Sequence, residues 1–331
     1  MPWPSGPLRE AVATVVRAAA AFEPVALLTA AGDDARARRT FGSDIVDALP
    51  LAPRSLRLRD IGPSFLVDGK GGSAAVDWRF DGWGKRGDSG DAGLAHALLG
   101  AAEVRRFRAP LTLEGSAIAA DGRGTVLALA AAAFDPARNP GLAPLDAFAI
   151  LKGWVGAARV IWIAAAHPAD TLLSDLRALA SFIAPGLVAV TDSGAPTFAA
   201  VADQLTRSRD GRGRPLELLR LPAPPEDAGL ASYSNFLPLN GGLLVPAFDA
   251  ASDARAADML AEHFPERSVQ LVPARELALA GVTLTSLALP HPARLLERDR
   301  ATVLPRSAWS QPTPDVEGLL QHYIDLAERE R

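Results

Sequence analysis

The strings YSNFLPLNGGLLVPAF at residues 233–248, SDARAADMLAEH at 252–263 and SVQLVPA at 268–274 decide the fold. Asn240 and Gly241 separate two apolar runs, and an Asn-Gly pair supplies the positive φ of a tight hairpin turn. The second string opens with Ser and Asp, which cap helices, and continues with apolar residues at helical spacing. The third string returns as a strand. Together they predict a unit of strand, strand, helix and strand.

The same signals recur along the chain. Asp68–Gly72 and Asp121–Gly124 each separate two apolar runs, so they predict two further β-hairpins. Residues 172–183 have apolar side chains at helical spacing, and LVAVT at 187–191 predicts a strand after a Pro-Gly break. Units that recur every several tens of residues indicate a pseudo-repeat α/β architecture. No low-complexity linker interrupts the chain, so we expect one domain over residues 1–331.

The composition argues against several classes of protein. The 34 Lys and Arg residues and 38 Asp and Glu residues give a formal net charge of -4, which leaves no basic excess for a phosphate backbone or an anionic membrane. The longest apolar stretch, Val126 to Phe134, is too short to span lipid, and the first residues lack the pattern of a secretory signal. We therefore expect a cytoplasmic protein that binds neither nucleic acid nor membrane.

Cysteine and histidine usage limits the chemistry further. The chain has no cysteine, which removes disulfides, thiolate metal ligands and thiolate nucleophiles. Its five histidines are scattered, without H-x-x-x-H or H-E-x-x-H spacing. We expect no metal site and no cofactor.

Seven short strings occur in a fixed order across roughly residues 55–290. They are RDIGPSF at 59–65, VDWRFDGWG at 76–84, LEGSAIAADGRGT at 113–125, RNP at 138–140, FIAPG at 182–186, ASYSNFLPLNGGLLVPAFD at 231–249 and FPERSVQLVPA at 264–274. In spelling and order the set resembles the agmatine deiminase family, which includes the Porphyromonas-type peptidylarginine deiminases. The resemblance implies the pentein fold, a five-bladed α/β propeller of ββαβ-type units around a central channel.

The resemblance also implies a mechanism. In that family a cysteine attacks the guanidinium carbon, a histidine is the general acid and base, and two carboxylates hold the cationic substrate. The first carboxylate falls at Asp60, in a string that has Arg57 where the family has a tryptophan. Asp60 is then either a guanidinium anchor or the partner of a neighbouring arginine. The aromatic wall of the substrate site is expected to be lost.

Other family positions carry different side chains. Counting back from FIAPG places the family histidine at Asp175 and the second carboxylate at Arg177, and Leu284 stands at the cysteine. His167 lies upstream and is more typical of a loop. An arginine in place of a carboxylate repels a cationic substrate, so Arg177 is expected to pair with Asp60 or Asp175, or to present its fork to an anion.

Two features near these positions leave alternatives open. Glu114, in the LEG string, either binds a ligand cation or caps backbone amides as a buried carboxylate. Thr285 and Ser286 are hydroxyls beside Leu284, but a hydroxyl nucleophile needs an adjacent base, and the resemblance places no histidine there.

Three functions are compatible with these substitutions. The first is a family member that has lost deiminase activity and acts as a binding or regulatory pseudoenzyme, for a small molecule in the channel or a protein. The second is a hydrolase of altered mechanism that uses Asp60, Glu114 and Asp175 as acid and base. The third is an inactive subunit that assembles with a catalytic paralogue or with itself. An open channel favours a small ligand, and a plugged channel favours a partner surface.

Overall fold

Short strands and helices alternate along the whole described chain. The computed structural model describes residues 1–42, 46–67, 72–85, 87, 89–164, 175–192 and 195–292. Its strands are β1 (Val25–Leu28), β2 (Val46–Leu49), β3 (Ser64–Val67), β4 (Ser73–Asp77), β5 (Arg105–Arg108), β6 (Ile118–Ala120), β7 (Thr125–Leu129), β8 (Arg159–Ile163), β9 (Ala180–Ala184), β10 (Leu187–Thr191), β11 (Glu217–Leu221), β12 (Leu237–Leu239), β13 (Gly242–Ala247) and β14 (Ser268–Pro273). Its helices are α1 (Arg9–Ala20), α2 (Asp34–Phe41), α3 (Leu58–Ile61), α4 (Gly82–Lys85), α5 (Leu94–Ala101), η1 (Gly115–Ala117, a 3-10 helix), α6 (Ala130–Ala133), α7 (Pro144–Val155), α8 (Leu176–Leu179), α9 (Pro196–Thr206), α10 (Ala251–His263), α11 (Arg275–Leu279) and α12 (Leu284–Leu287).

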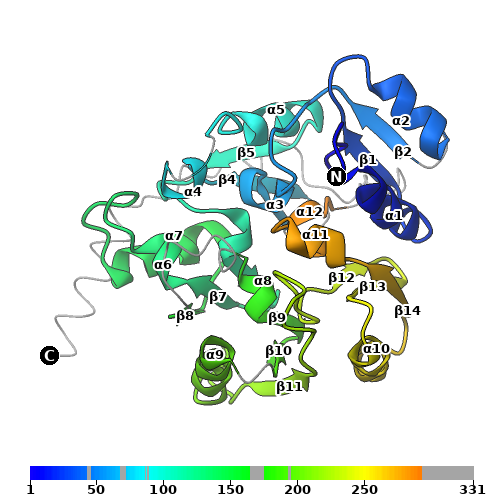
Figure 1. The fold of residues 1–331 in the computed structure, drawn as a ribbon. Helices are drawn as coiled ribbons and strands as arrows, with labels where there is room; N and C mark the ends of the chain where they lie inside the picture. The colour runs from blue at the N-terminus through cyan, green and yellow to red at the C-terminus, as the bar shows by residue number, and fades with distance from the viewer. Residues whose placement is uncertain are drawn as a thin grey trace, which may run out of the picture.

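The described strands form five sheets that follow one another around a common centre (Figure 1). In four of them an antiparallel hairpin precedes a helix and a strand that runs parallel to the second hairpin strand; the strand orders are β3-β4-β5, β6-β7-β8, β9-β10-β11 and β12-β13-β14. The remaining sheet pairs β1 with β2 in parallel. Parallel neighbours need a crossover connection, which α2, α5, α7, α9 and α10 supply. The predicted α/β pentein architecture of ββαβ units is confirmed.

The predicted hairpins are present. Asn240-Gly241 joins β12 to β13, where Gly241 has a φ of 75°, and the loop at 121–124 joins β6 to β7. Strands β3 and β4 also pair antiparallel, although the loop between them, residues 68–71, lies outside the described part of the chain. The unit at 233–274 has the predicted order of strand, strand, helix and strand, but the predicted cap is wrong: α10 begins at Ala251 with Ala250 at its N-cap, and Ser252 and Asp253 lie inside the first turn.

The helix predicted over residues 172–183 is wrong beyond a single turn. Helix α8 ends at Leu179, and β9 follows it and pairs with β10 across the Pro185-Gly186 turn. Residues 172–174 lie outside the described chain. The apolar pattern was too short to separate helix from strand, and pairing with β10 decides the outcome. As a consequence, Asp175 is the N-cap of a short helix and not part of a long one.

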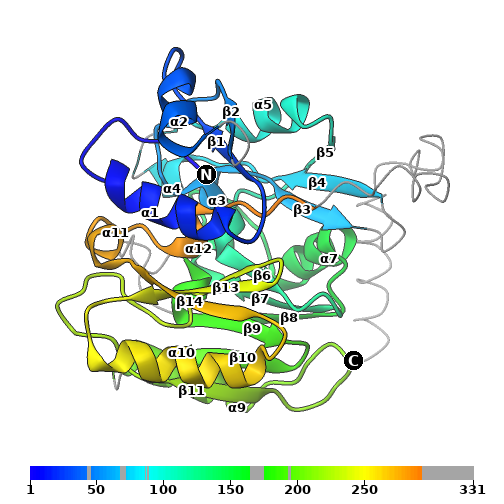
Figure 2. The same cartoon turned by 90° about the vertical axis from the view of Figure 1, so that its right-hand side faces the viewer.

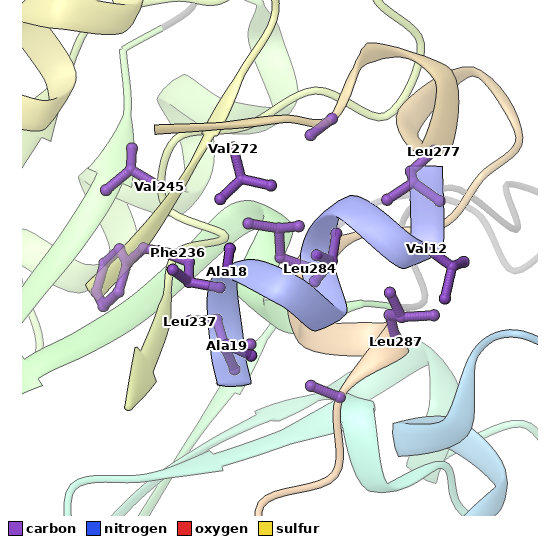
Figure 3. Close-up of a cluster of buried hydrophobic side chains, with 14 of the residues drawn as sticks. Val12, Ala18, Ala19, Phe236, Leu237, Val245, Val272, Leu277, Leu284 and Leu287 are labelled. Carbon is purple, nitrogen blue, oxygen red and sulfur yellow. The ribbon is translucent and has the colours of Figure 1, made fainter. Parts of the chain in front are cut away.

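The centre of the ring contains short helices instead of strands. Figure 1 shows α3, α8 and α12 in the middle, whereas α5, α9 and α10 lie at the periphery (Figures 1 and 2). The largest apolar cluster packs α1 against the sheet β12-β13-β14 and against α11 and α12 (Figure 3). This packing fixes the position of α12 beside α3 and α8. In the described residues, no helix has the length and apolar character needed to cross a membrane.

Candidate functional site

The ends of the central helices bring the predicted site residues together. Asp60 lies on α3, Glu114 directly precedes η1, Asp175 caps α8 and Leu284 begins α12. Each of these four residues has at most 1% of its surface exposed. We call Asp60, Glu114, Asp175, Arg177 and Leu284 the central site.

Asp60 binds an arginine of the same chain. Its Oδ2 lies 2.9 Å from Nε of Arg57 and accepts a 2.7 Å hydrogen bond from the indole Nε1 of Trp83. The Arg57 guanidinium also lies 5.6 Å from the centroid of the Trp83 ring, within cation–π range. Burial raises the pKa of the Asp60 carboxyl, and the Arg57 cation opposes that rise. Of the two alternatives for Asp60, pairing with a neighbouring arginine is the one observed.

An aromatic ring lies beside Asp60 and Arg57. Trp83 has a φ of 56°, a left-handed conformation that bulky residues rarely adopt, and its ring lies beside Arg57. The contact between Trp83 and Asp60 was not predicted from the sequence. The VDWRFDGWG string, in which two Gly residues flank the indole, was the only indication that Trp83 is special. Its contact with Asp60 joins residues 23 positions apart and depends on the fold.

Glu114 forms the second internal ion pair. Its two carboxylate oxygens accept hydrogen bonds from Nη2 and Nη1 of Arg138 at 2.5 and 3.1 Å. The same guanidinium contacts Asp81 at 3.0 Å. Burial raises the pKa of the Glu114 carboxyl, and Arg138 opposes the rise. Of the two alternatives for Glu114, capping of backbone amides is not observed, because a bidentate arginine binds both carboxylate oxygens.

Asp175 connects α8 to α12 through neutral donors. Its Oδ1 accepts the backbone N–H of Arg177 at 3.0 Å, as an N-cap does. Its Oδ2 accepts the hydroxyl of Thr283 at 2.6 Å and the side-chain amide of Asn235 at 3.2 Å. The Thr285 hydroxyl lies 3.4 Å from the same oxygen. The carboxylate is thus held by the cap and by hydroxyl and amide groups.

The guanidinium groups of Arg177 and Arg59 have no carboxylate partner among the described residues. Arg177 donates from Nη1 to the carbonyl of Ile118 at 3.2 Å, and Arg59 donates from Nε to the carbonyl of Thr285 at 2.6 Å. In the described part of the chain, neither guanidinium lies within the 4.0 Å of a carboxylate oxygen that defines an ion pair. The predicted ion pair of Arg177 with Asp60 or Asp175 is therefore not formed. The ion pair with Asp175 is absent because the N-cap geometry directs the backbone N–H of Arg177, and not its side chain, toward Asp175.

Leu284 belongs to the apolar core. Figure 3 shows it among side chains of α1, of the sheet β12-β13-β14 and of α11, including Ala18 and Leu277. The two flanking hydroxyls serve the helix end: Ser286 Oγ accepts the backbone N–H of Thr283, and Thr283 Oγ1 accepts that of Ser286. In this capping box the hydroxyl oxygens of Thr283 and Ser286 are bound to backbone N–H groups, which opposes their use as nucleophiles. His167 lies outside the described residues.

The geometry describes a site whose carboxylates are all engaged by the protein. Asp60 and Glu114 each hold an arginine, and Asp175 holds α12. Within the described residues, no group of three His, Cys, Asp or Glu side chains is arranged to hold a metal ion. Among the residues that the structure describes, Arg59 and Arg177 each donate one hydrogen bond to a backbone carbonyl and have further N–H donors, and both residues are half-buried.

Comparisons with known proteins agree with the fold and identify the family. The sequence profile of the Porphyromonas-type peptidyl-arginine deiminases matches residues 3–292. The chain is 31% identical over 324 residues to the agmatine deiminase of Pseudomonas putida, covering 87% of this chain and 88% of that protein. It is also similar in fold to the agmatine deiminase of Enterococcus faecalis, with a TM-score of 0.81, 24% identity and coverage of 89% of this chain and 93% of that one. The chain belongs to the Porphyromonas-type peptidyl-arginine deiminase family.

Proposed function

We propose that this chain has lost guanidine hydrolysis and acts as a binding or regulatory member of its family. The observation that carries the proposal is at position 284, which the motif spacing assigns to the nucleophile. Leu284 is 1% exposed and packs in the apolar core, and the chain has no cysteine at any position. A leucine has no lone pair to offer a guanidinium carbon, so a covalent intermediate of the family type cannot form there.

Arg57 supports the same proposal from the substrate side. Its guanidinium is bound to Asp60 and lies against Trp83, in the way that a substrate guanidinium is expected to be held. The Arg57 side chain is only 12% exposed. A substrate cation would have to displace it and strand a second cation in a buried region, which opposes binding.

The altered hydrolase receives less support. Such an enzyme needs a carboxylate that is free to take a proton from water. Asp60 and Glu114 are each held by an arginine, and Asp175 accepts from Thr283 and from the Arg177 backbone. Recruiting any of them for catalysis breaks a contact that holds the centre of the fold. We therefore favour binding over an altered reaction.

The deciding experiment is an assay for ureido products. Purified chain is incubated separately with agmatine, arginine and arginine-containing peptides, and ureido groups are measured by colour reaction. The Pseudomonas putida relative serves as the positive control and the heat-killed chain as the blank. We expect no product above the blank. Product that increases with the concentration of native chain, and that survives further purification, would refute the proposal.

The binding role extends to protein partners, either a second copy of the chain or a catalytic paralogue. Native mass measurement of the purified chain separates a monomer from a homo-oligomer. Capture of a catalytic relative from the native extract, at fixed stoichiometry, would support the role of inactive subunit. A monomer that captures no relative would leave the small-molecule role.

A further inference from the structure

Around Asp60 and Asp175, guanidinium groups outnumber carboxylates. Three guanidinium groups, of Arg57, Arg59 and Arg177, face two carboxylates, of Asp60 and Asp175. Arg57 forms an ion pair with Asp60, and Asp175 accepts hydrogen bonds from hydroxyl, amide and backbone donors. One positive charge is therefore left over on the side of Arg59 and Arg177.

A chain of contacts leads from the guanidinium of Arg59 to the backbone of Arg177. Arg59 donates to the carbonyl of Thr285, whose hydroxyl lies 3.4 Å from Asp175 Oδ2. Asp175 Oδ1 in turn accepts the backbone N–H of Arg177. Burial and, after it, the charge of Arg177 lower the pKa of Arg59 to about 9, so the two cations act on each other. Two like charges held close together in a partly dehydrated place stabilise an anion between them.

Building on the proposed binding role, we propose that Arg59 and Arg177 bind the carboxylate of a small monoanionic molecule. Each guanidinium donates one hydrogen bond to a backbone carbonyl and keeps other N–H groups for a planar partner. Arg59 and Arg177 are half-buried residues, whereas Asp60 and Asp175 are buried. A carboxylate matches the fork of an arginine in shape as well as in charge.

The neighbouring charges favour one negative charge over two. A monoanion neutralises the excess, while a phosphate dianion leaves net negative charge against Asp60 and Asp175. The adjoining group of Arg138, Glu114 and Asp81 carries an excess of negative charge, and it acts on Asp60. Glu114 and Asp81 both contact Arg138. The anion is therefore expected on the face away from Glu114.

Titration of the full chain with trifluoroacetate, followed by fluorine NMR at constant ionic strength, tests the proposal. We expect saturable broadening, a dissociation constant on the order of 1 mM, and displacement by acetate but not by equimolar n-butylammonium. Arg177→Gln is expected to weaken binding at least about tenfold. Arg212→Gln removes an exposed arginine on a distant turn and should bind as the wild-type chain does.

The outcomes are separable. Absence of saturable broadening, unchanged binding by Arg177→Gln, or displacement by phosphate in preference to acetate would each overturn the carboxylate site. If Arg177→Gln does not fold, Arg177→Lys keeps the charge but loses the fork, and several-fold weaker binding supports the site. Ureido product from agmatine refutes the proposed function whatever the anion does; no product together with no acetate binding refutes the anion site alone.

Discussion

Replacing Arg57 with alanine is the sharpest perturbation of the central site. The change leaves Asp60 buried beside the indole N–H of Trp83 but without the cation whose Nε lies 2.9 Å away. With about 4 Å between charge centres and an effective dielectric of about 20, the lost attraction is about 4 kcal/mol. This agrees with the cost of about 3–5 kcal/mol for removing one partner of a buried pair. We expect Arg57→Ala to lower the free energy of unfolding by that amount at pH 8.

The pH dependence of the free energy of unfolding gives a second test of the pair between Arg57 and Asp60. Burial already places the pKa of Asp60 above its ordinary value, and removing Arg57 raises it further. A carboxyl whose folded pKa exceeds the unfolded value of about 3.9 holds its proton more tightly when folded, so stability falls as pH rises through the interval between the two. The deficit of Arg57→Ala should therefore be smaller at pH 5 than at pH 8.

Urea unfolding of the wild-type and variant chains at both pH values measures this. The matched control is the double variant Arg57→Ala/Asp60→Asn, which strands no charge and is expected to lose less stability at pH 8 than Arg57→Ala alone. Millimolar methylguanidine should raise the melting temperature of Arg57→Ala and leave that of the wild-type chain unchanged. A variant within about 1 kcal/mol of wild type at pH 8, or a deficit that does not change with pH, would show that Asp60 is not neutralised by Arg57.

Three further predictions follow from neighbouring contacts. Leu284→Cys should give no ureido product in the colour assay, because position 175 carries a carboxylate that is bound to Thr283 and no imidazole; turnover by this variant would contradict our assignment of the lost chemistry. Arg138→Ala should lower the free energy of unfolding by about 3–5 kcal/mol in urea, and Arg138→Ala/Glu114→Gln by less, since the single change strands a buried carboxylate; equal losses would argue against a charged Glu114. Gly115→Ala should cost about 1–3 kcal/mol by urea unfolding, because its Cβ would lie 2.5 Å from the Arg59 carbonyl oxygen, whereas Gly100→Ala in α5 meets nothing within 4 Å and should be neutral or slightly stabilising; equal effects would refute the close approach.

Local signals in the sequence predicted the units of the fold well. Asn240-Gly241 and the loop at 121–124 specify hairpins because their residues reach positive φ at low cost, whatever surrounds them. The segment before Pro185 was assigned wrongly because helix and strand are decided there by pairing with β10, which is a tertiary interaction. Short apolar patterns carry no information about such a partner.

The positions of the central site were predictable, but most of their contacts were not. Asp60 and Arg57 are three residues apart, so their pairing was one of the alternatives open from the sequence. Glu114 and Arg138 are 24 positions apart and meet only because of how the sheets are arranged. Arg177 failed to pair as expected because a one-turn helix, and not a long one, sets its direction. Distance along the chain is thus what limited the prediction.

The burial of Leu284 in the core against α1 has an evolutionary consequence. A thiol is smaller and less apolar than an isobutyl group, so returning cysteine to this position forfeits part of the packing with Ala18 and Leu277. A lineage that regained the thiol would first carry a less stable protein, with Arg57 still seated on Asp60 and no imidazole at position 175. Such epistasis hinders reversal. Each substitution is harmful to reverse by itself, and only several reversals together would restore the family's catalytic groups. Under the proposed function, the core as much as the central site opposes a return of deiminase chemistry.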